Sequence, residues 1–206
     1  MTDKKTSDYI NSPLQKTPIA DLCHVYLETP DVYKDLVSGK CADPKYCVTL
    51  ILDTKRPDHA AYLKALNDLN DAVGKELMAN LPKVGSKAYR VKDIARAEED
   101  DDGNPTGRYF LKATSKTKRQ VLDSTGKAAV PAHVLTKAGN GSTGRVIMSL
   151  KKSIASQQKT VGLTLYLDKA QLITIVERTG GTGGTGFDSV DGGFTAEPTF
   201  DDGSNF

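Results

Sequence analysis

Aromatic and cationic side chains alternate over residues 108–119. The strand-like run Arg108-Tyr109-Phe110-Leu111-Lys112-Ala113-Thr114 continues into Lys116, Lys118 and Arg119. Successive side chains of a strand point to opposite faces, so Phe110 and Lys112 face outward together if Leu111 faces a core. An exposed ring beside cations is typical of surfaces that bind single-stranded nucleic acid, where bases stack and phosphates are neutralised. The alternative is that Phe110 belongs to the core and the cations are merely solvated.

A second candidate surface lies on a hairpin predicted for residues 145–150 and 161–167. Val161, Leu163, Leu165 and Leu167 form its apolar face, and Tyr166 lies on the opposite face. Arg145 begins the first strand, and Lys151 and Lys152 precede the turn. Cations on a barrel rim favour an electropositive groove. The alternative for Tyr166 is a half-exposed tyrosine of the sheet with no ligand.

Charge is divided unevenly along the chain. All 28 Lys and Arg residues lie in residues 1–179, whereas residues 180–206 carry five acidic residues and no basic one. The overall net charge of +2 therefore hides a basic body and an acidic tail. This division predicts a polyanion-binding body that carries its own competitor. The tail ends in Asp201, Asp202 and Phe206, a pattern suited to anchoring in a protein pocket.

Other chemistry is less well supported by the sequence. The acidic run 98–102 could hold magnesium, but consecutive carboxylates on a turn rarely converge on one metal ion, and a solvated loop is the default. Cys23, Cys41, Cys47 and two histidines lack zinc-site spacing, so we interpret the thiols as reduced, small apolar residues. The glycine-threonine stretch 179–186 lacks a Gly-Lys-Ser/Thr signature and is predicted to be a linker. No metal and no cofactor are expected.

These side chains need a β framework to position them. Alternation predicts strands over 22–26, 46–52, 108–114, 145–150, 161–167 and 172–176, with a weaker one over 87–94. One amphipathic helix begins at Pro57 and ends before Pro82. Because strands and helices do not alternate regularly, the pattern favours an all-β barrel with one capping helix. We predict a flexible arm over 1–21, one barrel domain over 22–178 and a disordered tail over 179–206. Neither a signal peptide nor a membrane span is expected.

The chain resembles the single-stranded DNA-binding proteins of tailed bacteriophages, of the T-odd type. The segments that carry the resemblance are 20–26, 46–52 with the helix after it, 108–115 and 161–172, together with the acidic tail ending in Phe206. The resemblance implies an oligonucleotide-binding (OB) barrel with a helix inserted after an early strand. It also implies sequence-independent binding of single-stranded DNA in phage DNA replication, recombination and repair, in the cytoplasm of the host bacterium.

The same resemblance implies partners. The tail would contact the phage DNA polymerase and the helicase–primase, and the protein would form a homodimer. The predicted partner-binding residues are Asp201, Asp202 and Phe206. Stacking is predicted for Phe110 and Tyr166, and phosphate contacts for Lys112, Lys116, Lys118, Arg119, Arg145, Lys151 and Lys152. Two alternatives stay open: a metal-dependent DNA-processing enzyme that uses residues 98–102, and a phage structural or scaffold protein.

Overall fold

The long strands of the structure follow the segments in which apolar residues alternate. The computed structural model describes residues 8–32, 43–81 and 89–178. Its five long strands are β2 (Ala20–Asp31), β3 (Lys45–Asp53), β6 (Pro105–Ser115), β8 (Thr143–Ala155) and β9 (Thr160–Thr174). The strands predicted over 22–26, 46–52, 108–114, 145–150 and 161–167 each lie within one of them. The weaker strand predicted over 87–94 corresponds, in its described part, only to the short β4 (Arg90–Val91). The separate last strand predicted over 172–176 is wrong, because β9 continues unbroken from Thr160 to Thr174.

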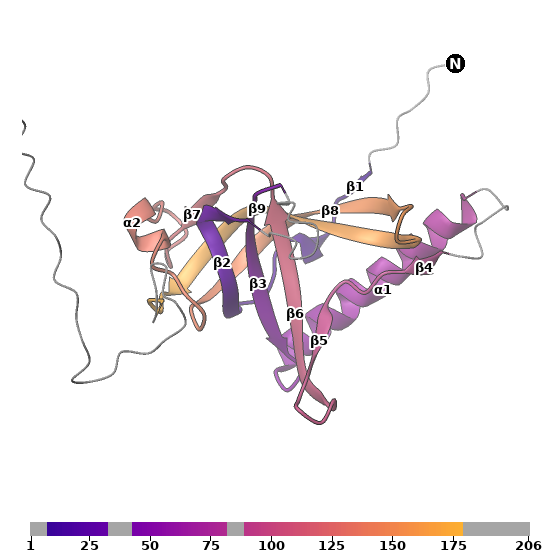
Figure 1. Ribbon diagram of the computed structural model, residues 1–206, viewed down its shortest axis with the longest axis horizontal. Helices are drawn as coiled ribbons and strands as arrows, with labels where there is room; N and C mark the ends of the chain where they lie inside the picture. The colour runs from indigo at the N-terminus through magenta and orange to yellow at the C-terminus, as the bar shows by residue number, and fades with distance from the viewer. Residues whose placement is uncertain (1–7, 33–42, 82–88, 179–206) are drawn as a thin grey trace, which may run out of the picture.

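The five long strands close into a ring. They follow the order β8-β2-β3-β6-β9, and β8 pairs with β9 to complete the circuit (Figure 1). All neighbouring pairs are antiparallel except β6 and β9, which are parallel at Thr114 and Tyr166. Closure leaves no free edge between these strands. The prediction of a β-barrel is therefore confirmed.

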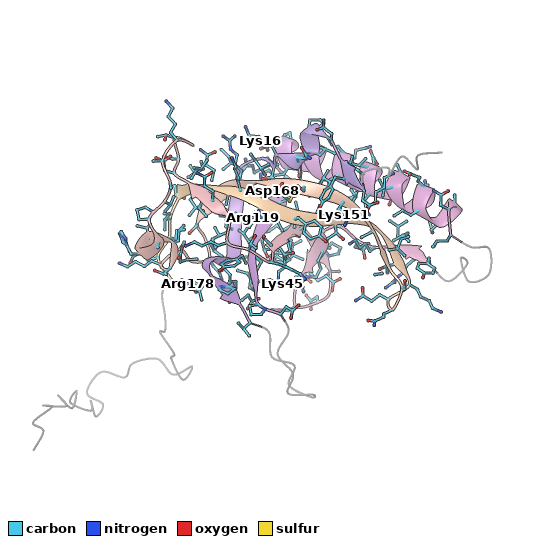
Figure 2. All side chains as sticks on the ribbon, turned by 90° about the horizontal axis from the view of Figure 1, so that it is seen from above. Lys16, Lys45, Arg119, Lys151, Asp168 and Arg178 are labelled. Atoms are coloured by element: carbon cyan, nitrogen blue, oxygen red, sulfur yellow. The ribbon has the colours of Figure 1, made fainter. Side chains whose placement is uncertain are left out.

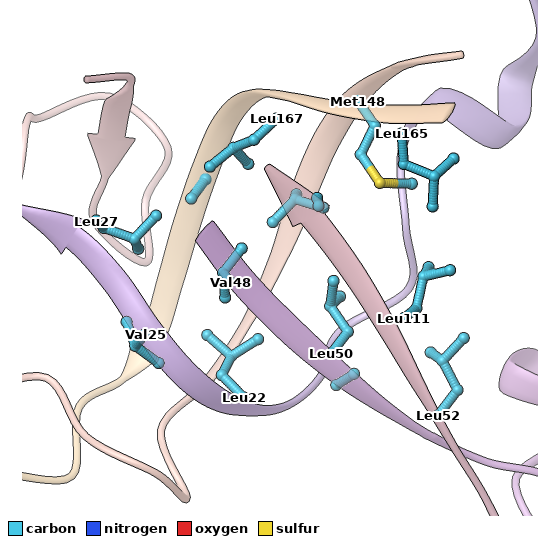
Figure 3. Close-up of a cluster of buried hydrophobic side chains, with 14 of the residues drawn as sticks. Leu22, Val25, Leu27, Val48, Leu50, Leu52, Leu111, Met148, Leu165 and Leu167 are labelled. Carbon is cyan, nitrogen blue, oxygen red and sulfur yellow. The ribbon is translucent and has the colours of Figure 1, made fainter. Parts of the chain in front are cut away.

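The core fills the inside of this ring with leucine, valine and methionine. Leu22, Leu50 and Leu111 lie opposite one another on β2, β3 and β6, and all three are buried (Figure 3). Met148, Leu165 and Leu167 close the core from β8 and β9. Because one face of each strand is used by the core, the other face of the same strands points outward.

Short elements complete the described part of the chain. They are β1 (Tyr9–Ile10), η1 (Pro13–Gln15), β4 (Arg90–Val91), β5 (Arg96–Glu99), β7 (Gln120–Leu122) and α2 (Ala132–Leu135). Two of them, β1 and η1, lie in the range predicted as a flexible arm, and β1 pairs with β8. Thr17 in that range exchanges hydrogen bonds with Val146 on β8.

The helix α1 (Pro57–Ala79) covers one end of the barrel. It begins at Pro57, whose missing N–H is not needed in the first turn. The buried Asn70 joins it to β9 and to the residue that follows β4: its amide accepts from the Leu163 N–H at 2.8 Å and donates to the Lys92 carbonyl at 2.8 Å. An added Cβ on Gly162 would lie 2.6 Å from Asn70, so this close approach requires glycine. The predicted capping helix is confirmed.

A buried histidine also holds α1 in place. His59 accepts a hydrogen bond from the Asp53 N–H through Nδ1, at 3.0 Å, and its Nε2 lies 2.9 Å from the Ile19 carbonyl. Both ring nitrogens are thus used in joining α1 to β3 and to Ile19, just before β2, so His59 is not available as a ligand. Among the described residues no helix is long and apolar enough to span a membrane.

Candidate nucleic-acid interface

The outward faces of β2, β3 and β6 form one continuous surface, which we call the outer platform. Strand register places its residues in rows, because directly paired residues point to the same face. Phe110 pairs with Ile51, Lys112 with Thr49, and Thr114 with Cys47. The rows continue onto β2, where Cys23 pairs with Thr49 and Tyr26 with Cys47. The platform therefore consists of Cys23, Tyr26, Cys47, Thr49, Ile51, Phe110, Lys112 and Thr114.

Phe110 and Lys112 point outward, as the alternation along 108–114 predicts. Phe110 is partly exposed, and the Arg96 guanidinium lies 5.2 Å from the centre of its ring. Lys112 is exposed, and no ion pair with it is found within the described ranges. An aromatic ring and an exposed ammonium thus lie two residues apart on one strand, where they can serve a base and a phosphate.

Tyr26 adds a second ring at the opposite side of the platform. A bulge at His24, whose φ is 50°, shifts the phase of β2 so that Cys23 and Tyr26 share the outward face. The Arg178 guanidinium lies 5.2 Å from the centre of the Tyr26 ring. Arg178 also donates to the carbonyls of Val25 and Ala138. The end of the described chain is therefore fixed beside the platform.

The side chains between the two rings are small and uncharged. Cys23, Cys47 and Thr49 point outward, yet each is less than a tenth exposed. Burial raises the pKa of the Cys47 thiol, and the nearby Lys112 partly offsets this. Burial likewise raises the pKa of Cys23. Both thiols stay protonated at neutral pH, which agrees with their interpretation as small apolar residues; Cys41 lies outside the described residues.

The platform continues across β6 onto β9. Tyr166 is directly paired with Thr114 and is 36% exposed, so it extends the row that holds Tyr26 and Cys47. Beyond the end of β6, Arg119 donates to the Ser115 hydroxyl at 2.9 Å. Lys116 is exposed, whereas Lys118 forms an ion pair with Glu28 at 2.5 Å. Three aromatic rings and several cations thus lie on one curved outer surface.

The hairpin cations separate into different environments. Arg145 and Lys151 point outward from β8, and Lys151 lies near the carboxylate of Asp8 at 3.9 Å. Lys152 is on the opposite face of β8, paired with the buried Leu163, and its ammonium lies 2.5 Å from Glu76 on α1. In Figure 2, Lys151 lies along the hairpin away from Lys16, Asp168 and Arg119. The structure therefore brings Lys152 to α1 and not to the outer platform.

The acidic run 98–102 has a structural role. Glu98 forms an ion pair with Arg108 at 3.2 Å and accepts a hydrogen bond from Thr106. Asp100 accepts hydrogen bonds from the backbone of Asn104 and Asp102, and the Asn104 contact holds its pKa below the ordinary value. Within the described ranges, no group of three or more His, Cys, Asp or Glu side chains could hold a metal ion.

Some residues of this surface were not predicted from the sequence. Tyr26 lies in a segment whose strand was predicted, but the bulge that turns it outward leaves no simple signal in the alternation. Arg96 and Arg178 lie on the rings of Phe110 and Tyr26 only through tertiary packing. Conversely, the predicted tail residues Asp201, Asp202 and Phe206 lie outside the described residues.

The fold has close counterparts among solved structures. gp2.5, a single-stranded DNA-binding protein encoded by bacteriophage T7, matches with a TM-score of 0.59 at 17% identity, over 88% of this chain and 97% of that one. The single-stranded DNA-binding protein of bacteriophage Enc34, in complex with single-stranded DNA, matches with a TM-score of 0.56 at 17% identity, over 86% and 96%. No protein-family model and no curated protein sequence matches. The chain therefore has the OB-type fold of these phage single-stranded DNA-binding proteins.

Proposed function

We propose that this protein binds single-stranded DNA without sequence preference and acts by binding alone. The observation that carries the proposal is the outer platform: Phe110, Tyr26 and Tyr166 lie on one continuous surface with the exposed Lys112. Rings of this kind stack on any base, which explains why such binding tolerates every sequence. The Enc34 protein, whose fold this chain shares, is known in complex with single-stranded DNA, which adds support.

The proposal assigns base stacking and phosphate contacts to different residues. Phe110, Tyr26 and Tyr166 stack on bases, while Lys112, Lys116 and Arg119 neutralise phosphates near the platform. Lys118 and Lys151 contribute less, because Glu28 and Asp8 lie beside them. Arg145 lies further along β8, on the same outward side as Lys151. Lys152, which the sequence predicts as a phosphate contact, is proposed to contribute least, because its ion pair with Glu76 directs it away from this surface.

The acidic tail is proposed to compete with DNA for the same surface. Two observations support this role. Residues 180–206 carry five acidic residues without a basic one, and Arg178, just before the tail, is fixed beside Tyr26 on the platform. A tethered anion that starts at the binding surface acts at high effective concentration. We also propose that Asp201, Asp202 and Phe206 bind replication proteins, namely the phage DNA polymerase and the helicase–primase.

The proposed setting is phage DNA replication, recombination and repair in the host cytoplasm, with the protein as a homodimer. This part of the proposal rests on the resemblance described above and on the shared fold. Mass measurement in solution by light scattering tests the dimer directly. A monomer at micromolar concentration would contradict it.

The first experiment measures binding of fluorescein-labelled oligo-dT by anisotropy over a series of salt concentrations. Binding that weakens steeply with salt is expected, because each neutralised phosphate contributes about 0.7 to the log–log slope for a single strand. Phe110→Ala should weaken binding about tenfold at any salt, in keeping with stacking of about 1–3 kcal/mol per base. Lys112→Gln should instead reduce the salt slope. A wild-type affinity that does not change with salt would contradict the proposal.

Deletion of residues 180–206 tests the competing tail. The deleted chain should bind oligo-dT more tightly than the full chain at low salt, and the difference should shrink as salt screens the tail. Equal affinity of the two chains at low salt would show that the tail does not compete. Loss of binding to the polymerase in the deleted chain, measured by pull-down, tests the recruiting role separately.

A further inference from the structure

A cavity of about 310 Å³ lies on the outward side of β8 and β9, beyond Tyr166. We call it the β8–β9 pocket; its cationic lining residues are Lys16, Arg145 and Lys169, and its other lining residues include Leu122, Ile147 and Gln171. We infer that this pocket binds one phosphate-bearing nucleotide unit of the same DNA strand that crosses the outer platform. The inference rests on the proposed function and extends it to a second subsite.

The arginine of the pocket is held in position before any ligand arrives. Arg145 donates through Nε to the side-chain oxygen of Gln171 at 2.7 Å. Gln171 in turn donates through its amide nitrogen to the carbonyls of Asp123, at 3.1 Å, and Ser124, at 2.8 Å. The two terminal nitrogens of the guanidinium remain for an anion, in the geometry that suits a phosphate. Gln171 is therefore a positioning residue for Arg145.

The turn that fixes Gln171 is itself ordered. The Asp123 carboxylate accepts hydrogen bonds from the Thr125 hydroxyl and from the backbone of Lys127 and Ala128. On the other side, the segment that carries Lys16 is joined to β8, because Thr17 exchanges two hydrogen bonds of 3.0 Å with Val146. Both walls of the pocket are thus built on fixed backbone, which reduces the ordering cost of binding.

The pocket has an uncompensated positive charge. Among the described residues no carboxylate lines it, and no ion pair involves Lys16, Arg145 or Lys169. Several other cations of the protein have a carboxylate within 4.0 Å, among them Lys118 and Lys152. Three cations around one small cavity create a local field that favours an anion, and DNA supplies one charge with every phosphate.

The pocket also offers an apolar surface of the right extent. Ile147 is 43% exposed on β8, and Leu122 lines the opposite wall. A volume of about 310 Å³ is at the lower end of small-molecule sites, which suits a single nucleotide unit better than a larger ligand. The apolar walls can receive a base or sugar while the three cations contact the phosphate.

A DNA strand that crosses the outer platform and continues past Tyr166 reaches the β8–β9 pocket. Tyr166 and Lys169 are three residues apart on β9, a separation of about 10 Å along a strand. Tyr166 is itself paired with Thr114 of the platform. The path from Phe110 over Tyr166 to Lys169 therefore stays on one outward surface. This continuity favours DNA as the occupant over an acidic protein segment.

The test compares two lengths of labelled oligo-dT, about 4 and about 16 nucleotides, which span the usual site sizes of an OB fold. In the full chain, Lys16→Gln with Lys169→Gln should weaken binding of the longer oligonucleotide about tenfold and leave the shorter one within about twofold. Loss of the one phosphate contact in the pocket should also lower the salt slope for the longer one by about 0.7. Gln171→Ala should weaken the longer oligonucleotide in the same way.

A charge-matched control separates the pocket from overall charge. Lys55→Gln with Lys75→Gln also removes two positive charges, but from exposed positions at and near α1. It should leave the affinities for both oligonucleotides unchanged. If Lys16→Gln with Lys169→Gln binds both lengths as wild type does, the pocket takes another anion, such as an acidic peptide, and the inference is overturned. If the wild-type chain binds neither length, the proposed function itself fails and the inference with it.

Discussion

The two ends of the β8–β9 hairpin carry cations in opposite circumstances. At the end beside α1, Lys152 of the hairpin pairs with Glu76, and Lys92, which follows β4, donates to the hydroxyls of Ser153 and Thr164. At the other end, Arg145 and Lys169 line a cavity to which no described residue brings a carboxylate. The same hairpin therefore uses its cations for structure at one end and leaves them available at the other. What distinguishes the ends is the neighbouring element, since α1 supplies acids and amides while the 123–126 turn supplies carbonyls.

The largest effect is expected when the link between α1 and the hairpin is removed. Asn70→Ala should lower the free energy of unfolding by about 3 kcal/mol, because the Leu163 N–H and the Lys92 carbonyl would lose a buried partner. Chemical denaturation measures the change. Asn67→Ala, at an exposed position on the same helix, is the matched control and should cost less than about 0.5 kcal/mol. Equal effects of the two variants would show that α1 does not hold the hairpin through Asn70.

The strands and the helix could be predicted from the sequence, whereas the contact made by Asn70 could not. The alternation of Tyr46, Val48, Leu50 and Leu52 and the apolar spacing of the helix after Pro57 were sufficient for the strands, the helix and the barrel. They were sufficient because a buried face imposes a period on the chain. That Asn70 reaches Leu163 and Lys92 could not be predicted, because the contact depends on where the helix packs.

The candidate site likewise contains residues that the sequence predicts and residues that it does not. Phe110 and Lys112 were predictable, since an alternating strand with Leu111 in the core leaves them outside. Tyr26 was not, because the residue that changes the phase of β2, His24, takes a positive φ that its neighbours in the sequence do not reveal. Lys152 lies on the face of β8 opposite to Arg145, and its ion pair with Glu76 could not be predicted, because it depends on where α1 packs.

Tyr166 tests which end of the hairpin contacts DNA. It lies between the platform and the β8–β9 pocket, so Tyr166→Ala should weaken binding of oligo-dT about tenfold through loss of stacking. Ile154→Ala is the control from the other end of the hairpin: Ile154 is 45% exposed, and its loss should leave the affinity unchanged. Anisotropy with the same labelled oligonucleotide measures both. A loss at Ile154 as large as at Tyr166 would mean that DNA contacts the α1 end.

Asp168 tests the same surface by a gain in affinity. Its carboxylate accepts a hydrogen bond from the Ser149 hydroxyl at 2.5 Å and lies on β9 between Tyr166 and Lys169. Asp168→Asn keeps an acceptor for Ser149 and removes a charge that repels phosphates, so binding should tighten about threefold at low salt. The gain should disappear at high salt because the repulsion is screened. Unchanged or weaker binding at low salt would indicate that the strand does not pass this carboxylate.

The smallest effect is expected at Lys152, and it decides whether pairing or proximity governs the contribution of a cation. Lys152→Gln should change the affinity for oligo-dT less than about twofold, because its ammonium is held by Glu76 on the opposite face of the hairpin from Lys151. Glu76→Gln provides the complementary change: it frees Lys152 without moving it and should also leave the affinity unchanged. A tenfold loss in Lys152→Gln would restore this residue as a phosphate contact. It would then follow that the hairpin rearranges on binding, because in the present arrangement Lys152 shares its face with the buried Leu163.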